Sequence, residues 1–141
     1  MKKIFMVLVM IFSVSSLSAV ELGTMAPNFK ATTLSGKEVS LDQFKGKKAV
    51  WLVFWATWCP YCQKEIPALK ELHKKYGDKV EILAIHIGVN DSIFSNEITR
   101  QYKVRGTPTQ IVIDAKGRVV FKGTRVPQDI TEGNINALLA K

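Results

Sequence analysis

The sequence holds only two cysteines and two histidines among its 141 residues. Two cysteines allow at most one bridge within the chain, and a structural zinc site commonly takes four cysteine or histidine ligands. The chain also lacks internal repeats, low-complexity tracts and long linkers. Its hydrophobic share of 47% and charged share of 23% are typical of a globular protein. The length suits one domain, since domains commonly have about 100–150 residues.

No apolar run reaches the roughly 20 residues that a membrane-spanning helix needs. The first three residues include two lysines, residues 4–17 are mostly apolar, and Ser18 and Ala19 offer small residues for cleavage. This layout is typical of a secretory signal. We therefore expect residues 1–19 to be a signal peptide, with an uncleaved membrane anchor as the alternative. Residues 20–141 would then form the domain of a periplasmic or otherwise exported protein.

The net charge of +8 becomes +6 without residues 1–19, which carry two lysines and no acidic residue. The remaining lysines are scattered, and no motif interleaves basic and aromatic residues as in nucleic-acid binding. We therefore expect a solvated basic surface and no nucleic-acid partner.

Hydrophobic periodicity predicts a mixed α/β domain. Residues 49–56 (AVWLVFWA) form a continuous apolar run, which suits a central strand with Trp51 and Trp55 in the core. A helix is predicted over residues 59–76, where apolar residues recur every three or four positions, and Pro67 should kink it. The other expected elements are strands over residues 27–33 and 38–41, a helical turn at 42–44, a buried strand at 80–87, a short helix within 95–104, a hairpin of strands 110–114 and 118–122, and a closing helix at 131–140.

The central strand, helix and strand predict two parallel strands joined by a right-handed crossover. The later hairpin adds antiparallel strands. Together they predict a mixed sheet with helices on both faces.

Cys59 and Cys62 stand two residues apart in the stretch FWATWCPYCQKEIP. A structural disulfide is one interpretation, but a bridge that closes so short a loop adds little stability. A Cu(I) site with two thiolates and one histidine is the second, because soft thiolates suit Cu(I). The sequence has two histidines that could supply the third ligand: His86, which is expected in the core, and His73, which is expected on the outer face of its helix. A redox pair is the third interpretation.

The position of Cys59 between a buried strand and a helix favours the redox interpretation. There the sulfur would face unpaired backbone N–H groups and the positive end of the helix dipole, which should lower the pKa of Cys59. Pro60 is tolerated in the first helical turn, where a backbone N–H is not needed. Cys62, one turn further, is placed to attack a mixed disulfide and release the partner.

The stretch from Phe54 to Cys62, with Glu65 and Pro67, resembles the exported TlpA-like branch of the thioredoxin superfamily, which includes thiol–disulfide oxidoreductases of cytochrome c maturation. The resemblance covers nearly all of residues 21–141. Further matching positions are Gly23, residues 26–29, Leu41 and residues 44–47, which peroxiredoxins share, the loop 104–109, and Asp114 and Gly117. The peroxiredoxin active site itself is missing, because no proline stands in the stretch directly before Cys59 and Thr57 stands two positions before it instead of three.

The resemblance implies a thioredoxin fold with an N-terminal β-hairpin extension and a redox-active Cys59–Cys62 disulfide, without a metal or another cofactor. It also implies a cis bond between Thr107 and Pro108. The backbone of Thr107 would pair with an extended stretch of a client by strand addition. Trp58 would shield the disulfide and line the contact surface.

The sequence departs from these relatives at two places. Val53 stands where thioredoxin carries a buried aspartate. Only about twenty residues separate Gly88 from Pro108, too few for the strand and helix that TlpA-like proteins usually insert there together with the usual helix. No role is assigned to three acidic residues, Glu65, Asp91 and Glu97.

Pro60 and Tyr61, between the cysteines, should tune the reduction potential. Tyrosine supplies no cation, so an extreme oxidant is not expected, and a reductant or mild exchanger is favoured. We expect a monomeric exported enzyme that reduces disulfides of specific clients, with cytochrome c or copper-site maturation as the implied setting. Because the periplasm is kept oxidising, a membrane thiol reductant would supply the electrons. A disulfide oxidase or isomerase and a Cu(I) metallochaperone remain alternatives.

Overall fold

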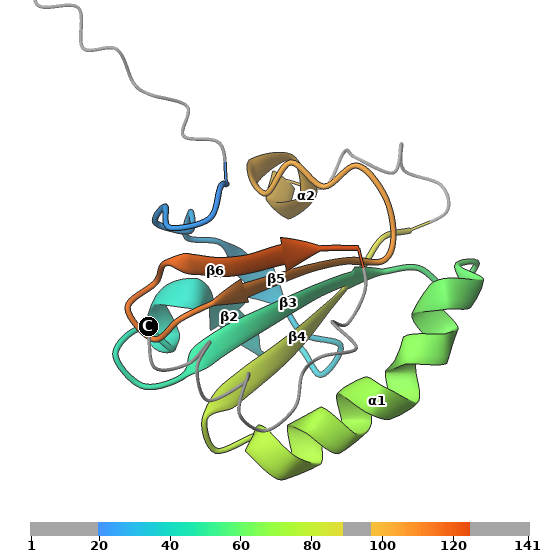
Figure 1. The fold of residues 1–141 in the computed structure, drawn as a ribbon, viewed down its shortest axis with the longest axis horizontal. Coiled ribbons are helices and arrows are strands. Elements are labelled where there is room, and N and C mark those ends of the chain that lie inside the picture. Colours follow the sequence, from blue (N-terminus) through green and yellow to red (C-terminus); the bar gives the residue numbers. More distant parts are fainter. Residues whose placement is uncertain (1–19, 89–96, 125–141) are drawn as a thin grey trace, which may run out of the picture.

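A computed structural model describes residues 20–88 and 97–124. The expected signal peptide, the closing helix and Asp91 lie outside these ranges. The described part contains two sheets, two α-helices and a short 3-10 helix (Figure 1). The strands are β1 (Lys30–Thr32), β2 (Glu38–Ser40), β3 (Ala49–Trp55), β4 (Val80–His86), β5 (Thr109–Ile113) and β6 (Val119–Gly123), and the helices are η1 (Leu41–Gln43), α1 (Pro60–Tyr76) and α2 (Glu97–Gln101). The predicted order of elements is confirmed through residue 124.

The main sheet has the strand order β4-β3-β5-β6. β3 is parallel to β4 and antiparallel to β5, which confirms the predicted mixed sheet. Val53 of β3 lies opposite Ala84 on one side and Gln110 on the other. β1 and β2 form a separate antiparallel pair, which is the expected hairpin extension.

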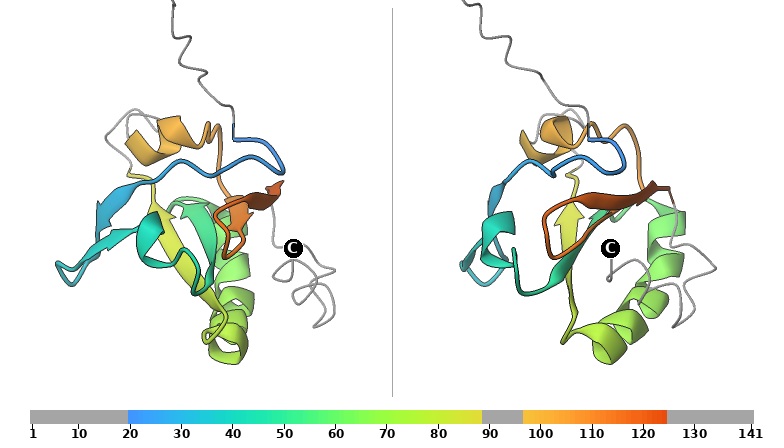
Figure 2. Two further views of the ribbon diagram at one scale, coloured as in Figure 1. Left: turned by 90° about the vertical axis from the view of Figure 1, so that its left-hand side faces the viewer. Right: turned by 60° about the vertical axis from the view of Figure 1, so that its left-hand side comes forward.

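Helices cover both faces of the main sheet, as Figure 2 shows. Side chains alternate along a strand, so β3 contributes to two cores. Trp51 and Val53 pack with residues of α1 on one face. Leu52 and Phe54 pack on the other face with the region of α2 and the N-terminal segment. This arrangement is the expected thioredoxin fold. No helix within residues 20–88 or 97–124 has the length and apolar character needed to cross a membrane.

The expectation that β4 is a buried strand is wrong. Among the described strands β4 pairs with β3 alone, so it forms an edge of the sheet and is mostly only half-buried. It borders a hollow of about 1060 Å³ that separates it from β1. His86 is accordingly exposed, with its ring edge-on to Trp55 at 5.0 Å between centroids. The predicted core position of His86 is therefore also wrong, and Trp55 is only half-buried.

Candidate active site

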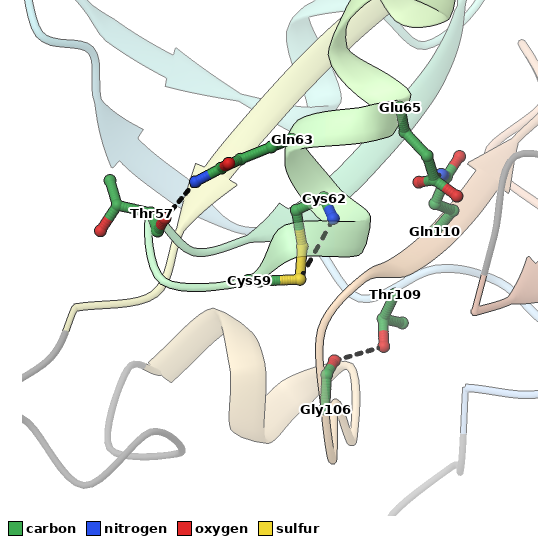
Figure 3. The surroundings of a disulfide bond; sticks show 8 residues. All are labelled: Thr57, Cys59, Cys62, Gln63, Glu65, Gly106, Thr109 and Gln110. Carbon is green, nitrogen blue, oxygen red and sulfur yellow. Dashed lines mark hydrogen bonds between the residues drawn. A yellow bond between two sulfur atoms is a disulfide. The ribbon is translucent and has the colours of Figure 1, made fainter.

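The two cysteines form a disulfide at the junction of β3 and α1 (Figure 3). The apolar run of β3 ends at Trp55, and α1 begins at Pro60, the first helical residue. Cys59 is the N-cap of α1 and has extended backbone angles. Its sulfur accepts a hydrogen bond from the backbone N–H of Cys62 at 3.2 Å. The sequence-predicted junction is thus confirmed, with the sulfur of Cys59 at the helix N-terminus.

This position has a chemical consequence for Cys59. A backbone N–H that points at the sulfur favours a thiolate, because hydrogen bonds to charged acceptors are stronger than those to neutral ones. The helix dipole acts in the same direction. Both cysteines are only 3% exposed, so a partner has to approach closely to reach either sulfur. In the reduced state the N-terminus of α1 would therefore favour the thiolate form of Cys59.

Exposed aromatic side chains flank the buried cysteines. Trp58 is 47% exposed and Tyr61 is 58% exposed, which makes them two of the few large apolar residues at the described surface. The ammonium of Lys64 lies 5.7 Å from the ring centroid of Tyr61. The side-chain amide of Gln63 donates to the carbonyl of Thr57 at 2.6 Å and ties the first helical turn to the preceding loop (Figure 3). Trp58 and Tyr61 thus expose apolar surface beside the disulfide.

The loop before β5 contains the expected cis peptide bond between Thr107 and Pro108. The hydroxyl of Thr109 donates to the carbonyl of Gly106 at 2.7 Å, which holds the loop closed at its base (Figure 3). Pro108 is buried and shares a cavity with Cys62. The hydroxyl of Thr107 is buried and has no partner within the described part of the chain. The structure thus brings the loop to the disulfide.

That cavity, of about 370 Å³, lies between α1 and the sheet, next to Cys62. Its walls are mostly apolar and include Val53, Ile66, Leu69, Ile82 and Ala84. Glu65 also lines it, one helical turn after Cys62. Residues three apart on a helix share a face, so the spacing places the carboxylate on the same side of α1 as Cys62.

Sequence reasoning missed a buried polar chain behind this cavity. Gln110 of β5 is fully buried. Its amide oxygen accepts from the indole N–H of Trp51 at 2.8 Å, and its amide nitrogen donates to Glu65 at 2.7 Å. Because Val53 lies opposite Gln110, the buried polar group at this level comes from β5 and not from β3. The only sequence signal was a glutamine inside the apolar stretch TQIVI.

A metal site at the cysteines would need further ligand side chains close to them. Within residues 20–88 and 97–124, no group of three or more histidine, cysteine, aspartate or glutamate side chains lies close enough to hold one ion. His73 is exposed on α1, as expected, although it lines the cavity beside Cys62. Glu97 begins α2 and accepts a hydrogen bond from Gln101 at 3.4 Å.

Comparisons with known proteins agree with this chemistry. The sequence profile of the AhpC/TSA family matches residues 22–95. The thiol–disulfide oxidoreductase ResA of Bacillus cereus is 38% identical, in a match that covers 79% of this chain and 76% of ResA. The thioredoxin-like protein YneN of Bacillus subtilis is 32% identical, in a match that covers 80% of this chain and 78% of YneN.

Solved structures share the fold. A thiol:disulfide interchange protein of the thioredoxin family from Chlorobium tepidum has a TM-score of 0.65 and 26% identity, and the match covers 86% of this chain and 97% of that one. The thioredoxin domain of a thiol–disulfide oxidoreductase from Bacteroides vulgatus has a TM-score of 0.70 and 23% identity, with 85% and 99% covered. The chain therefore belongs to the AhpC/TSA family of thioredoxin-like proteins and is a thiol–disulfide oxidoreductase related to ResA.

Proposed function

We propose that this protein is an exported reductant of disulfides in particular client proteins. The observation that carries the exchange chemistry of this proposal is the hydrogen bond from the N–H of Cys62 to the sulfur of Cys59 at the N-terminus of α1. It supports different roles for the two cysteines, because Cys59 lies where a thiolate is stabilised. The reducing direction rests on Pro60 and Tyr61, which add no positive charge to that thiolate.

The proposed reaction is dithiol–disulfide exchange. The thiolate of Cys59 attacks one sulfur of the client disulfide, and the other client sulfur leaves as a thiolate. Cys62 then loses its proton and attacks the sulfur of Cys59, which releases the second client thiolate. Two electrons pass to the client, and the Cys59–Cys62 disulfide remains. Glu65 is the proposed acceptor of the Cys62 proton, since both residues line one cavity.

Client recognition is proposed to combine strand addition with apolar contact. Within residues 20–88 and 97–124 the backbone of Thr107 makes no hydrogen bond, so its N–H and C=O can pair with an extended client segment. Main-chain pairing tolerates many sequences. Trp58 and Tyr61 then supply an exposed apolar surface beside the cysteines. Pro60 and Tyr61 tune the potential, and neither adds a positive charge to the thiolate.

The proposed setting follows from the N-terminal segment and the relatives. Residues 1–19 have the layout of a secretory signal. An exported reductant needs electrons from a membrane thiol reductant, because the periplasm is kept oxidising. Clients in cytochrome c or copper-site maturation would fit, as the resemblance to TlpA-like proteins implies.

Two measurements test the proposal. A redox titration of the Cys59–Cys62 pair against glutathione should give a potential well below about −120 mV, the value of a strong oxidant. A potential near that value would refute the reducing direction. Expression of Cys62→Ser in the exported compartment should trap clients as mixed disulfides on Cys59. The matched control is the Cys59→Ser, Cys62→Ser double variant, and equal capture by both proteins would contradict the assigned roles.

A further inference from the structure

We infer that Gln110 is a positioning residue for the resolving half of the exchange, and that Trp51 fixes the amide through which it acts. Gln110 holds the carboxylate of Glu65 at the cavity beside Cys62. The inference rests on the proposed dithiol exchange and extends it to two buried residues that touch neither sulfur.

The contacts form a chain from the sheet to the cavity. Gln110 lies in β5, two residues after Pro108, and is fully buried. Its Nε2 donates to Oε2 of Glu65 at 2.7 Å, and its Oε1 accepts from Nε1 of Trp51 at 2.8 Å. Figure 3 shows the side chains of Glu65 and Gln110 meeting between α1 and β5.

The indole of Trp51 settles which way the amide points. An indole nitrogen can only donate, so the amide oxygen of Gln110 must face Trp51 and the amide nitrogen must face Glu65. A reversed amide would set two donors against each other in the buried core, which is unfavourable. Glu65 is therefore held by a donor, which fixes the orientation of its carboxylate at the cavity beside Cys62.

Gln110 and Glu65 supply the polar side chains that β3 lacks at the position opposite Gln110. Val53, opposite Gln110, has no polar group, so the acid beside the cysteines comes from α1 and its orientation from β5. Within residues 20–88 and 97–124, the titratable groups that line the cavity besides Glu65 all belong to α1: Cys62, Lys70 and His73. β3, β4 and the loop before β5 contribute only groups that do not titrate: Val53, Trp55, Ile82, Ala84 and Pro108.

Gln110 assists the step in which Cys62 resolves the mixed disulfide. The thiol proton of Cys62 passes to the carboxylate of Glu65. The electron pair left on the Cys62 sulfur forms the bond to the sulfur of Cys59. The bond between Cys59 and the partner sulfur breaks, and the partner leaves as a thiolate. Attack by Cys59 does not use Glu65, so Gln110 should affect only the second step.

The reduced full-length protein can be tested with the aromatic disulfide dithiobis(nitrobenzoate), which separates the two steps. Attack by Cys59 releases one coloured thionitrobenzoate, and resolution by Cys62 releases the second. Gln110→Met keeps the side-chain size and removes the donor. The second phase should slow by about tenfold or more, part of the 10²–10⁴-fold that general base catalysis typically contributes. The first phase should stay within about twofold of the unchanged protein.

Gln110→Glu gives a signature that a merely structural role would not produce. Two neighbouring carboxyl groups share one proton at low pH, and that proton can replace the amide donor. The second phase should therefore match the unchanged protein near about pH 5 and fall increasingly behind it as the shared proton is lost toward about pH 9. Trp51→Phe, which frees the amide to rotate, should slow the second phase less than Gln110→Met.

The matched control is Gln101→Met, which breaks a second glutamine–glutamate pair, with Glu97 on the far face of the sheet. It should leave both phases unchanged. The inference is overturned if Gln110→Met leaves the second phase within about twofold, if it slows both phases equally, or if the relative rate of Gln110→Glu is constant with pH. If Gln110→Met does not fold, the Gln110→Glu profile decides. Absence of the second release in the unchanged protein would instead refute the proposed exchange.

Discussion

Tyr102→Phe should destabilise the protein and make its stability less sensitive to alkaline pH. Tyr102 follows α2 directly and is fully buried. Its ring centroid lies 6.1 Å from that of Phe29 and 6.2 Å from that of Phe54. Its hydroxyl donates to the carbonyl of Pro27 at 2.6 Å. One side chain therefore ties the N-terminal segment to β3 and to the chain that leads into the cis-proline loop.

The magnitude follows from what the substitution removes. Phenylalanine keeps the ring contacts and loses the hydroxyl, and a typical hydrogen bond contributes about 0.5–1.5 kcal/mol. Pro27 is only half-buried, so water can partly replace the lost donor, and we expect a loss of about 1 kcal/mol. For a domain of this size that corresponds to a fall in Tm of about 4 °C.

The pH dependence follows from the same burial. Burial raises the pKa of Tyr102 above the ordinary tyrosine value of about 10. Its contribution to stability is complete below that ordinary value. It is lost as the pH rises further, because the unfolded chain releases a proton that the native state keeps. At about pH 11 the loss reaches about 1.4 kcal/mol, enough to cancel the contribution of the hydroxyl.

Urea unfolding followed by circular dichroism, at pH 7 and through the alkaline range, measures both effects. The other tyrosines and the lysines occur in both proteins and cancel in the difference between them. The free energies of unfolding should differ by about 1 kcal/mol at neutral pH and converge near about pH 11. Parallel curves would show that the hydroxyl is not buried as described, and equal stability at neutral pH would show that its hydrogen bond contributes nothing.

Three further predictions concern single sites. Tyr61→His should raise the reduction potential by about 30 mV for each 1.4 kcal/mol of added thiolate stabilisation, as a glutathione titration would show, with Tyr61→Gln as an uncharged control. Gly117→Ala should lower the free energy of unfolding by about 1–2 kcal/mol, because Gly117 has a φ of 86° and an added Cβ would lie 3.1 Å from Met25 Cε. An unchanged midpoint of urea unfolding would contradict this prediction. Lys48→Met should destabilise by less than about 1 kcal/mol, since the 3.5 Å ion pair of Lys48 with Glu81 is partly exposed; a larger loss in the same assay would show that the contacts of Lys48 act together.

The order of elements could be predicted because each signal is local. The apolar run of β3 and the period of α1 each lie within one element, and both were confirmed. The position of β4 could not be predicted in this way. Its sequence VEILAIH is mostly apolar, but a strand's composition does not reveal how many neighbours it pairs with. The wrong placement of His86 followed from that one ambiguity.

In the candidate site, too, the local features could be predicted and the contacts between distant residues could not. The sequence motif identified Cys59 and Cys62, and the resemblance identified the cis bond before Pro108. Neither the motif nor the resemblance could identify the contacts of Gln110, because its partners Glu65 and Trp51 are 45 and 59 residues away in sequence. A buried glutamine requires hydrogen-bond partners. Its presence in an apolar strand therefore indicated that partners exist, but not which residues they are. Only the fold supplies the two partners.

In the proposed mechanism the two cysteines depend on different parts of the chain. The donor to the sulfur of Cys59 is a backbone N–H, which no substitution except one by proline removes. The groups that serve Cys62 are side chains from α1, β5 and β3: Glu65, Gln110 and Trp51. Attack and potential should therefore respond to residues 60 and 61 at the start of the helix, whereas resolution should respond to the buried polar chain. Substitutions in one set can change the lifetime of a mixed disulfide without changing how readily it forms.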